Sequence, residues 1–181
     1  MKYYYTFRLV FYTVLSVLIG VYSHQLLEYL PYLVGAVMCL FGIDSILIPV
    51  AKQPTKFYQN YQFFLGHVEL LLGIVVIAAI PYFDYVCVIW ATWTIVRESF
   101  DLYEVAHKVW HRFPAVLSLI LSVIEIVFSV LLLIYATEHH ALTHIYLLIP
   151  EFIINALSPI LFKVHTKHKA KKDKPKEEEN K

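Results

Sequence analysis

The 181-residue chain is poor in glycine, cysteine and charged residues. Its five glycines form neither a phosphate-cradling loop nor a dinucleotide-binding fingerprint, and no Ser or Cys lies in a recognisable nucleophile elbow. Cys39 and Cys87 each lie inside a long apolar run, which is typical of small packed residues rather than of a disulfide or a metal pair. We therefore expect a protein that is not an enzyme and that carries no cofactor.

Long apolar runs take the place of the missing polar motifs. The chain is 59% hydrophobic and 16% charged, with a mean hydropathy of +0.62. About 20 apolar residues cross the hydrocarbon core of a bilayer as a helix. The runs predict an all-α integral membrane bundle within residues 1–164, with spans near 6–22, 30–50, 62–80, 84–104, 114–136 and 142–162.

The basic residues indicate how this bundle is oriented. All fifteen Lys and Arg residues fall at the chain ends or near alternate connections: Lys2, Arg8, Lys52, Lys56, Arg97, Lys108, Arg112 and the eight from Lys163 to Lys181. The three other connections, near 24–28, 81–84 and 138–140, contain none. Cytoplasmic loops are enriched in Lys and Arg, so both termini are predicted to be cytoplasmic.

An internal repeat of about 54 residues is also visible. The odd-numbered spans each carry a triplet with spacing three then four, in which the outer residues are small: Thr13, Ser16 and Gly20; Gly66, Glu69 and Gly73; Ser122, Glu125 and Ser129. The even-numbered spans carry one acid each at similar depth, namely Asp44, Glu98 and Glu151. The repeat predicts three tandem helical hairpins near 6–50, 62–104 and 114–162. Small residues seven apart share one helix face and let a neighbouring backbone approach closely.

Three tandem hairpins with small residues in each first helix resemble the HdeD-like family of small six-helix bacterial membrane proteins. The matching stretches are 63–105 and 113–134, with Pro81 after Gly73 and Pro31 after Gly20. The third hairpin departs from the pattern, because Glu138, His139 and His140 stand in place of the turn proline. The resemblance implies a non-enzymatic protein of the bacterial inner membrane that contributes to acid or envelope stress tolerance.

Charged residues inside the spans are the main candidates for a functional site. They are Asp44, Glu69, Arg97, Glu98, Glu125 and Glu151. Ionised groups are costly in the bilayer, so these side chains should face the bundle interior. Only Arg97 and His67 are expected to offset the acids. Two interpretations remain open: a proton- or cation-binding site, as in a small coupled transporter, and polar contacts that hold the helices together.

Histidines gather near the outer connections, where His24, His139, His140 and His144 are candidates for a metal or pH-sensing site. His140 and His144 lie four residues apart and share one face of a predicted helix. The alternative is a polar outer rim that binds nothing.

The C-terminal residues 165–181 are polar and lysine-rich, and are predicted to be a disordered cytoplasmic tail. Anionic lipid headgroups of the inner leaflet are the expected partners of the basic residues there: Lys163, Lys167, Lys169, Lys171 and Lys172. A scaffold that recruits a protein through this tail is a further alternative. The small-residue faces also allow a homo-oligomer, and the chain has no folded basic module for nucleic acid.

Overall fold

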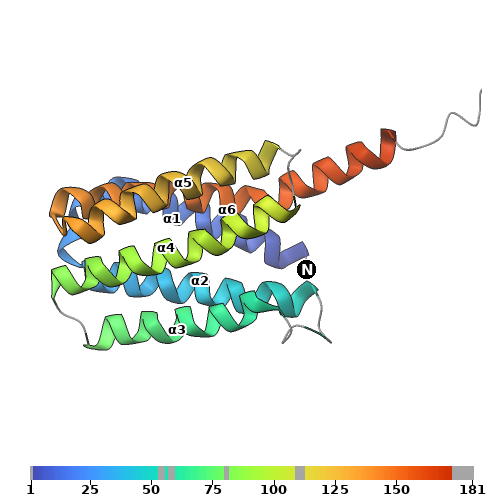
Figure 1. Ribbon diagram of the computed structural model, residues 1–181. Helices are drawn as coiled ribbons and strands as arrows, with labels where there is room; N and C mark the ends of the chain where they lie inside the picture. Colours follow the sequence, from blue (N-terminus) through green and yellow to red (C-terminus); the bar gives the residue numbers. More distant parts are fainter. Residues whose placement is uncertain (1, 53–55, 57–59, 80–81, 109–112, 173–181) are drawn as a thin grey trace, which may run out of the picture.

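The computed structural model describes residues 2–52, 56, 60–79, 82–108 and 113–172. Within this part of the chain the fold consists of six α-helices and no strand, which confirms the predicted all-α class. The helices are α1 (Lys2–Glu28), α2 (Leu30–Lys52), α3 (Tyr61–Ala79), α4 (Phe83–Lys108), α5 (Phe113–Ile134) and α6 (Glu138–Lys172). They form one elongated bundle in which successive helices run in opposite directions (Figure 1). The N-terminus and the end of α6 therefore lie at the same end of the bundle.

Helices α1 and α6 extend farthest beyond their predicted spans. Helix α1 bends at Tyr22, where the backbone angles leave the helical range, and then continues to Glu28. The predicted span thus ends at the bend rather than at the end of the helix. Helix α6 continues to Lys172, so the predicted tail of residues 165–181 begins within a helix. Residues 163–172 contain neither Pro nor Gly, the two residues that most disfavour a helix.

The helices pair most extensively as α2 with α3, α1 with α6, and α4 with α5. The predicted hairpins correspond instead to α1–α2, α3–α4 and α5–α6. Of these, α5 and α6 pack moderately and α1 and α2 touch at few points. The closest helix pairs therefore join neighbouring repeat units, or the first helix to the last, and the repeat itself remains a prediction from the sequence.

Helices α2 and α3 pack backbone to backbone through four glycines. Gly42 lies against Gly66, and Gly35 lies against Gly73. A Cβ atom added at Gly66 would lie 2.7 Å from the Gly42 carbonyl oxygen, and one added at Gly73 would lie 2.6 Å from that of Gly35. The close approach predicted for the Gly66–Gly73 face is confirmed. The corresponding face of α1 differs, because Thr13 and Gly20 are exposed.

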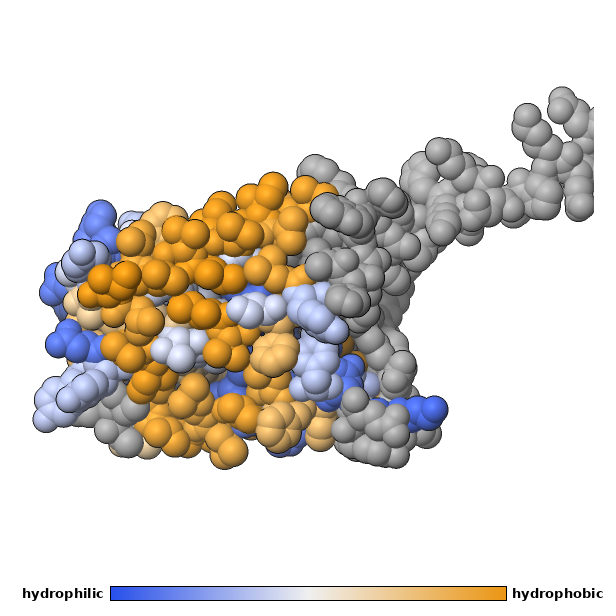
Figure 2. Space-filling view, viewed as in Figure 1, coloured by the Kyte–Doolittle hydropathy of each residue, from blue (hydrophilic) through white to orange (hydrophobic). Residues whose placement is uncertain are grey.

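The surface of the bundle is apolar over most of the face in Figure 2, and hydrophilic side chains lie mainly toward its left and right ends. Large exposed apolar residues occur on all six helices, among them Val14, Leu47, Leu71, Val96, Val127 and Ile153. Trp90, Phe41 and Phe152 are the largest of the fully buried side chains. A contiguous apolar surface of this extent is typical of a protein that contacts lipid.

Four helical segments are long and apolar enough to cross a membrane: Thr6–Glu28, Leu30–Val50, Tyr61–Ala78 and Glu138–Leu157. These segments support a membrane protein, but they are fewer than the six spans expected from the sequence. In α5 the apolar segment within the described residues, Leu119–Ile134, is shorter. Helix α4 contains Asp84, Arg97, Glu98 and Asp101 and is therefore less apolar as a whole.

Candidate functional site

Five of the six charged residues predicted within the spans come together in the bundle. Glu69 from α3, Arg97 and Glu98 from α4, Glu125 from α5 and Glu151 from α6 form what we call the interior cluster. Glu69, Glu98 and Glu125 are only 1%, 5% and 3% exposed. The side chains of Arg97 and Glu151 are each 13% exposed. The prediction that these charges face the interior is confirmed for all five.

Arg97 is the positive centre of the cluster. Its Nη1 lies 3.3 Å from Glu69 Oε1, and its Nη2 lies 3.7 Å from Glu151 Oε1. Its Nε lies 3.9 Å from Glu98 Oε1. The guanidinium carbon also lies 3.7 Å from the centre of the Phe41 ring, where the aromatic face attracts a cation. One guanidinium thus connects carboxylates from three helices.

Glu69 has the most complete set of donors in the cluster. Its Oε1 accepts hydrogen bonds from Trp93 Nε1 at 3.2 Å and from Arg97 Nη1 at 3.3 Å. Its Oε2 accepts one from the Ser45 hydroxyl at 3.2 Å. A buried carboxylate with three donors has most of its desolvation cost offset. Glu69 is therefore a structural anchor that joins α2, α3 and α4.

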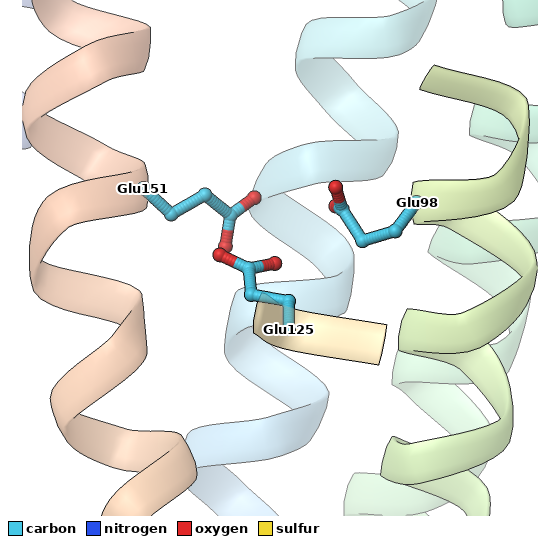
Figure 3. A group of neighbouring side chains, drawn as sticks. All are labelled: Glu98, Glu125 and Glu151. Carbon is cyan, nitrogen blue, oxygen red and sulfur yellow. The ribbon is translucent and has the colours of Figure 1, made fainter. Parts of the chain in front are cut away.

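The other three carboxylates face one another. Glu98, Glu125 and Glu151 project from three helices toward a common point, as Figure 3 shows, and each offers an oxygen within 4.8 Å of the other two. Glu125 Oε1 is buried and has no hydrogen-bond partner. Arg97 approaches Glu98 and Glu151 at longer distances than it approaches Glu69. This side of the cluster has more carboxyl groups than basic groups.

A small cavity adjoins these carboxylates. The volume open to the centre of a water molecule is about 10 Å³, roughly enough for one water. Its polar lining consists of Thr94, Arg97, Glu98, Glu125, His144 and Glu151. The Thr94 hydroxyl is buried and has no hydrogen-bond partner. Thr94 was not among the residues predicted from the sequence, because a lone threonine in an apolar helix is common.

Asp44 lies outside the interior cluster and has a partner that the sequence did not predict. Arg8 Nε lies 2.9 Å from Asp44 Oδ2, and the Tyr12 hydroxyl donates a hydrogen bond to the same oxygen. The expectation that only Arg97 and His67 offset the acids was therefore wrong. His67 is exposed, and its Nδ1 lies 2.7 Å from the Phe63 carbonyl oxygen of its own helix. Arg8 was grouped with the basic residues at the chain ends and not with the charges inside the spans, whereas it lies within α1, which begins at Lys2.

Replacing Tyr12 with Phe should destabilise the contact between α1 and α2. The change removes a hydrogen bond to a charged group, which is worth about 1.5–3 kcal/mol, and leaves the ring stacked on Phe152. Thermal unfolding in detergent should show a lower midpoint for Tyr12→Phe. Tyr22→Phe is the matched control, because Tyr22 is half exposed on the same helix, and it should unfold like the unaltered chain. Equal midpoints for both variants would show that this bond adds no stability.

The four candidate histidines do not share one environment. His24 and His139 are exposed, His140 is half-buried, and His144 is buried in the bundle. The His144 ring packs against Trp90, and its Nε2 lies 3.3 Å from the Ser129 hydroxyl. Among the described residues, the group of three or more possible ligands close enough to hold a metal is Glu98, Glu125 and Glu151, with no histidine. His144 thus belongs to the interior cavity rather than to an outer histidine site.

The five lysines expected to meet anionic lipid lie on the last turns of α6, which extend beyond the bundle in Figure 1. The side chains of Lys163, Lys167, Lys169, Lys171 and Lys172 lie outside the described part of the structure. Their role toward lipid remains a prediction.

No protein-family model matches this chain, and no curated protein or solved structure is similar to it. The function of the chain is therefore inferred from its sequence and from the geometry of the interior cluster.

Proposed function

We propose that this chain is a non-enzymatic multi-pass membrane protein that crosses the bilayer six times, with both termini in the cytoplasm. The observation that carries this proposal is the interior cluster inside an apolar exterior. A water-soluble helical protein places charges outside and apolar residues inside, whereas here Glu69, Glu98 and Glu125 are buried while large apolar side chains are exposed. In lipid, ionisable groups face the interior of a bundle and pair with one another.

The distribution of side chains on α4 supports this helix as a span despite its charges. Arg97 and Glu98 are directed into the bundle, whereas Val88, Val96 and Phe100 form part of the exposed side of the helix. Lipid would therefore meet an apolar surface on α4. Helix α5, with 22 residues, is also long enough to cross about 30 Å of hydrocarbon.

Reporter fusions test the six-span topology. A reporter fused at residue 83, at the start of α4, should report the outer side of the membrane, and one fused at Lys56 should report the cytoplasm. A fusion after Thr137 should report the outer side, and a fusion after Lys172 should report the cytoplasm. A cytoplasmic result at residue 83 would contradict the proposed topology.

We further propose that the protein acts in acid or envelope stress tolerance in the bacterial inner membrane, as its resemblance to the HdeD-like family implies. The ion pairs and the small size of the cavity support a packed protein rather than an open catalytic site. Loss of the gene should reduce survival after acid challenge, and the unaltered chain should restore it. A deletion strain that survives acid and detergent stress as well as its parent would count against this role.

A cation-coupled transporter is the second candidate, and one observation favours it: two unpartnered buried oxygens, Thr94 Oγ1 and Glu125 Oε1, adjoin the same cavity. In its present form the cavity holds about one water, so transport needs a further conformation in which it opens. Proteoliposomes with and without a pH gradient would separate the two candidates, because only a transporter produces cation flux above that of protein-free vesicles.

A further inference from the structure

We propose that Glu98, Glu125 and Glu151, together with the Thr94 hydroxyl, form a binding site for a small, hard divalent cation. The site joins α4, α5 and α6 at the cavity beside the interior cluster. This inference goes beyond the first function proposed above, a stress-tolerance protein that requires no ligand, and unlike the transporter candidate it concerns binding rather than movement of the ion.

The contacts within the bundle separate these three carboxylates from the other buried acids. Glu69 accepts hydrogen bonds from three different side chains. Asp44 is paired with Arg8 and bonded to Tyr12. Both of these acids already have hydrogen-bond donors. The three facing carboxylates, in contrast, lie mainly against one another, and Arg97 approaches Glu98 and Glu151 only at 3.9 and 3.7 Å.

The spacing of the three carboxylates suits an ion. Their nearest oxygens lie within 4.8 Å of one another. Oxygen ligands lie about 2.0–2.6 Å from Mg²⁺ or Ca²⁺, so two ligands on opposite sides of the ion are about 4–5 Å apart. An ion at the common point in Figure 3 would therefore reach all three groups with small side-chain movements.

Thr94 gives an observation that is independent of the acids. Its side chain is 5% exposed and lines the cavity, and its Oγ1 has no hydrogen-bond partner. A buried hydroxyl without a partner is costly, and coordination to an ion or to its bound water would remove that cost. Glu125 Oε1 adjoins the same cavity and is also without a partner. The free volume of about 10 Å³ is close to that of one water or one small ion.

The donor set selects the class of cation. Carboxylate and hydroxyl oxygens suit Mg²⁺, Ca²⁺ and Mn²⁺, whereas soft ions prefer sulfur. The residues that line the cavity include no cysteine. Glu98 and Glu151 share one guanidinium with Glu69, so a divalent cation would balance more of the carboxylate charge at the site than a monovalent cation.

Mn²⁺ alone is a suitable probe, because its electron paramagnetic resonance signal changes when the ion is bound. The full chain in lipid nanodiscs should bind about one Mn²⁺, and Glu125→Gln should weaken binding by about tenfold or more, since it removes a charged ligand while keeping the shape. Glu138→Gln is the matched control, because Glu138 is exposed in the first turn of α6 and should leave binding unchanged.

Absence of Mn²⁺ binding by the unaltered chain, or equal binding by the Glu125 and Glu138 variants, would overturn the proposal. If Glu125→Gln does not fold, two other measurements decide the question. Thr94→Val, which keeps the shape of the side chain, should weaken Mn²⁺ binding severalfold. Bound Mn²⁺ should also quench tryptophan fluorescence of the unaltered chain, because Trp90 and Trp93 line the cavity. Full fluorescence in saturating Mn²⁺ would contradict the site.

Discussion

Replacing Arg97 with Gln should destabilise the bundle by about 3–5 kcal/mol, the cost of leaving buried carboxylates without their counter-charge. Arg97 forms ion pairs with Glu69, Glu98 and Glu151, and its guanidinium also packs on Phe41. No neutral side chain replaces these contacts. The measurement is the unfolding midpoint in detergent, together with the fraction of folded protein recovered from membranes.

Two further variants distinguish loss of charge from loss of packing. Arg97→Lys keeps the charge but not the planar, forked donor group, so its stability should fall between those of the Gln variant and the unaltered chain. The double variant Arg97→Gln with Glu69→Gln removes one of the stranded carboxylates and should recover part of the loss. If the double variant is less stable than Arg97→Gln alone, the charge-pairing account of the cluster is wrong.

Substituting Ala for Gly66 should disrupt the contact between α2 and α3. The added Cβ would lie 2.7 Å from the Gly42 carbonyl oxygen and 2.9 Å from Ile46 Cγ1. A backbone carbonyl cannot move aside as the end of a flexible side chain can, so the helices must separate. Overpacking of this kind costs about 1–3 kcal/mol, and Gly66→Val should cost more. Thermal unfolding in detergent measures the difference.

Gly20→Ala is the matched control for this prediction. A Cβ atom at Gly20 meets only the end of the Ile149 side chain, at an ordinary distance of 3.6 Å. Since Ala also favours a helix over Gly, this variant should be as stable as the unaltered chain or more stable. Equal tolerance of Ala at positions 20 and 66 would mean that α2 and α3 do not pack through their backbones.

Hydropathy was sufficient to predict the helices because each apolar run is bounded by polar or turn-forming residues, as at Glu28 and Pro81. The pairing of helices was not predictable in the same way. The repeat suggested α3 with α4, whereas α3 packs mainly on α2, because α2 also carries glycines seven apart, at positions 35 and 42. Those two glycines were visible in the sequence, but the repeat did not include them.

The residues of the interior cluster were predictable because a charged side chain within an apolar run is costly against lipid and therefore faces the bundle interior. Their partners were not. Arg8 was excluded by its place near the chain start, and Thr94 has no signal in the sequence that separates it from other threonines in helices. His144 was grouped with the histidines near it in the chain. It is buried because it lies on the side of α6 that faces α4 and α5, where it contacts Trp90 and Ser129.

The most direct test of the central claim, that a lipid-facing apolar surface encloses a charged interior, is the accessibility of spin labels in nanodiscs. The native Cys39 and Cys87 are first replaced, so that only introduced cysteines carry a label. Single cysteines then replace Val14, Leu71 and Val127, which are exposed apolar residues on α1, α3 and α5. We predict that these labels collide readily with oxygen, which dissolves in lipid, and rarely with a water-soluble nickel complex. Strong collision with the nickel complex at all three positions would contradict the account.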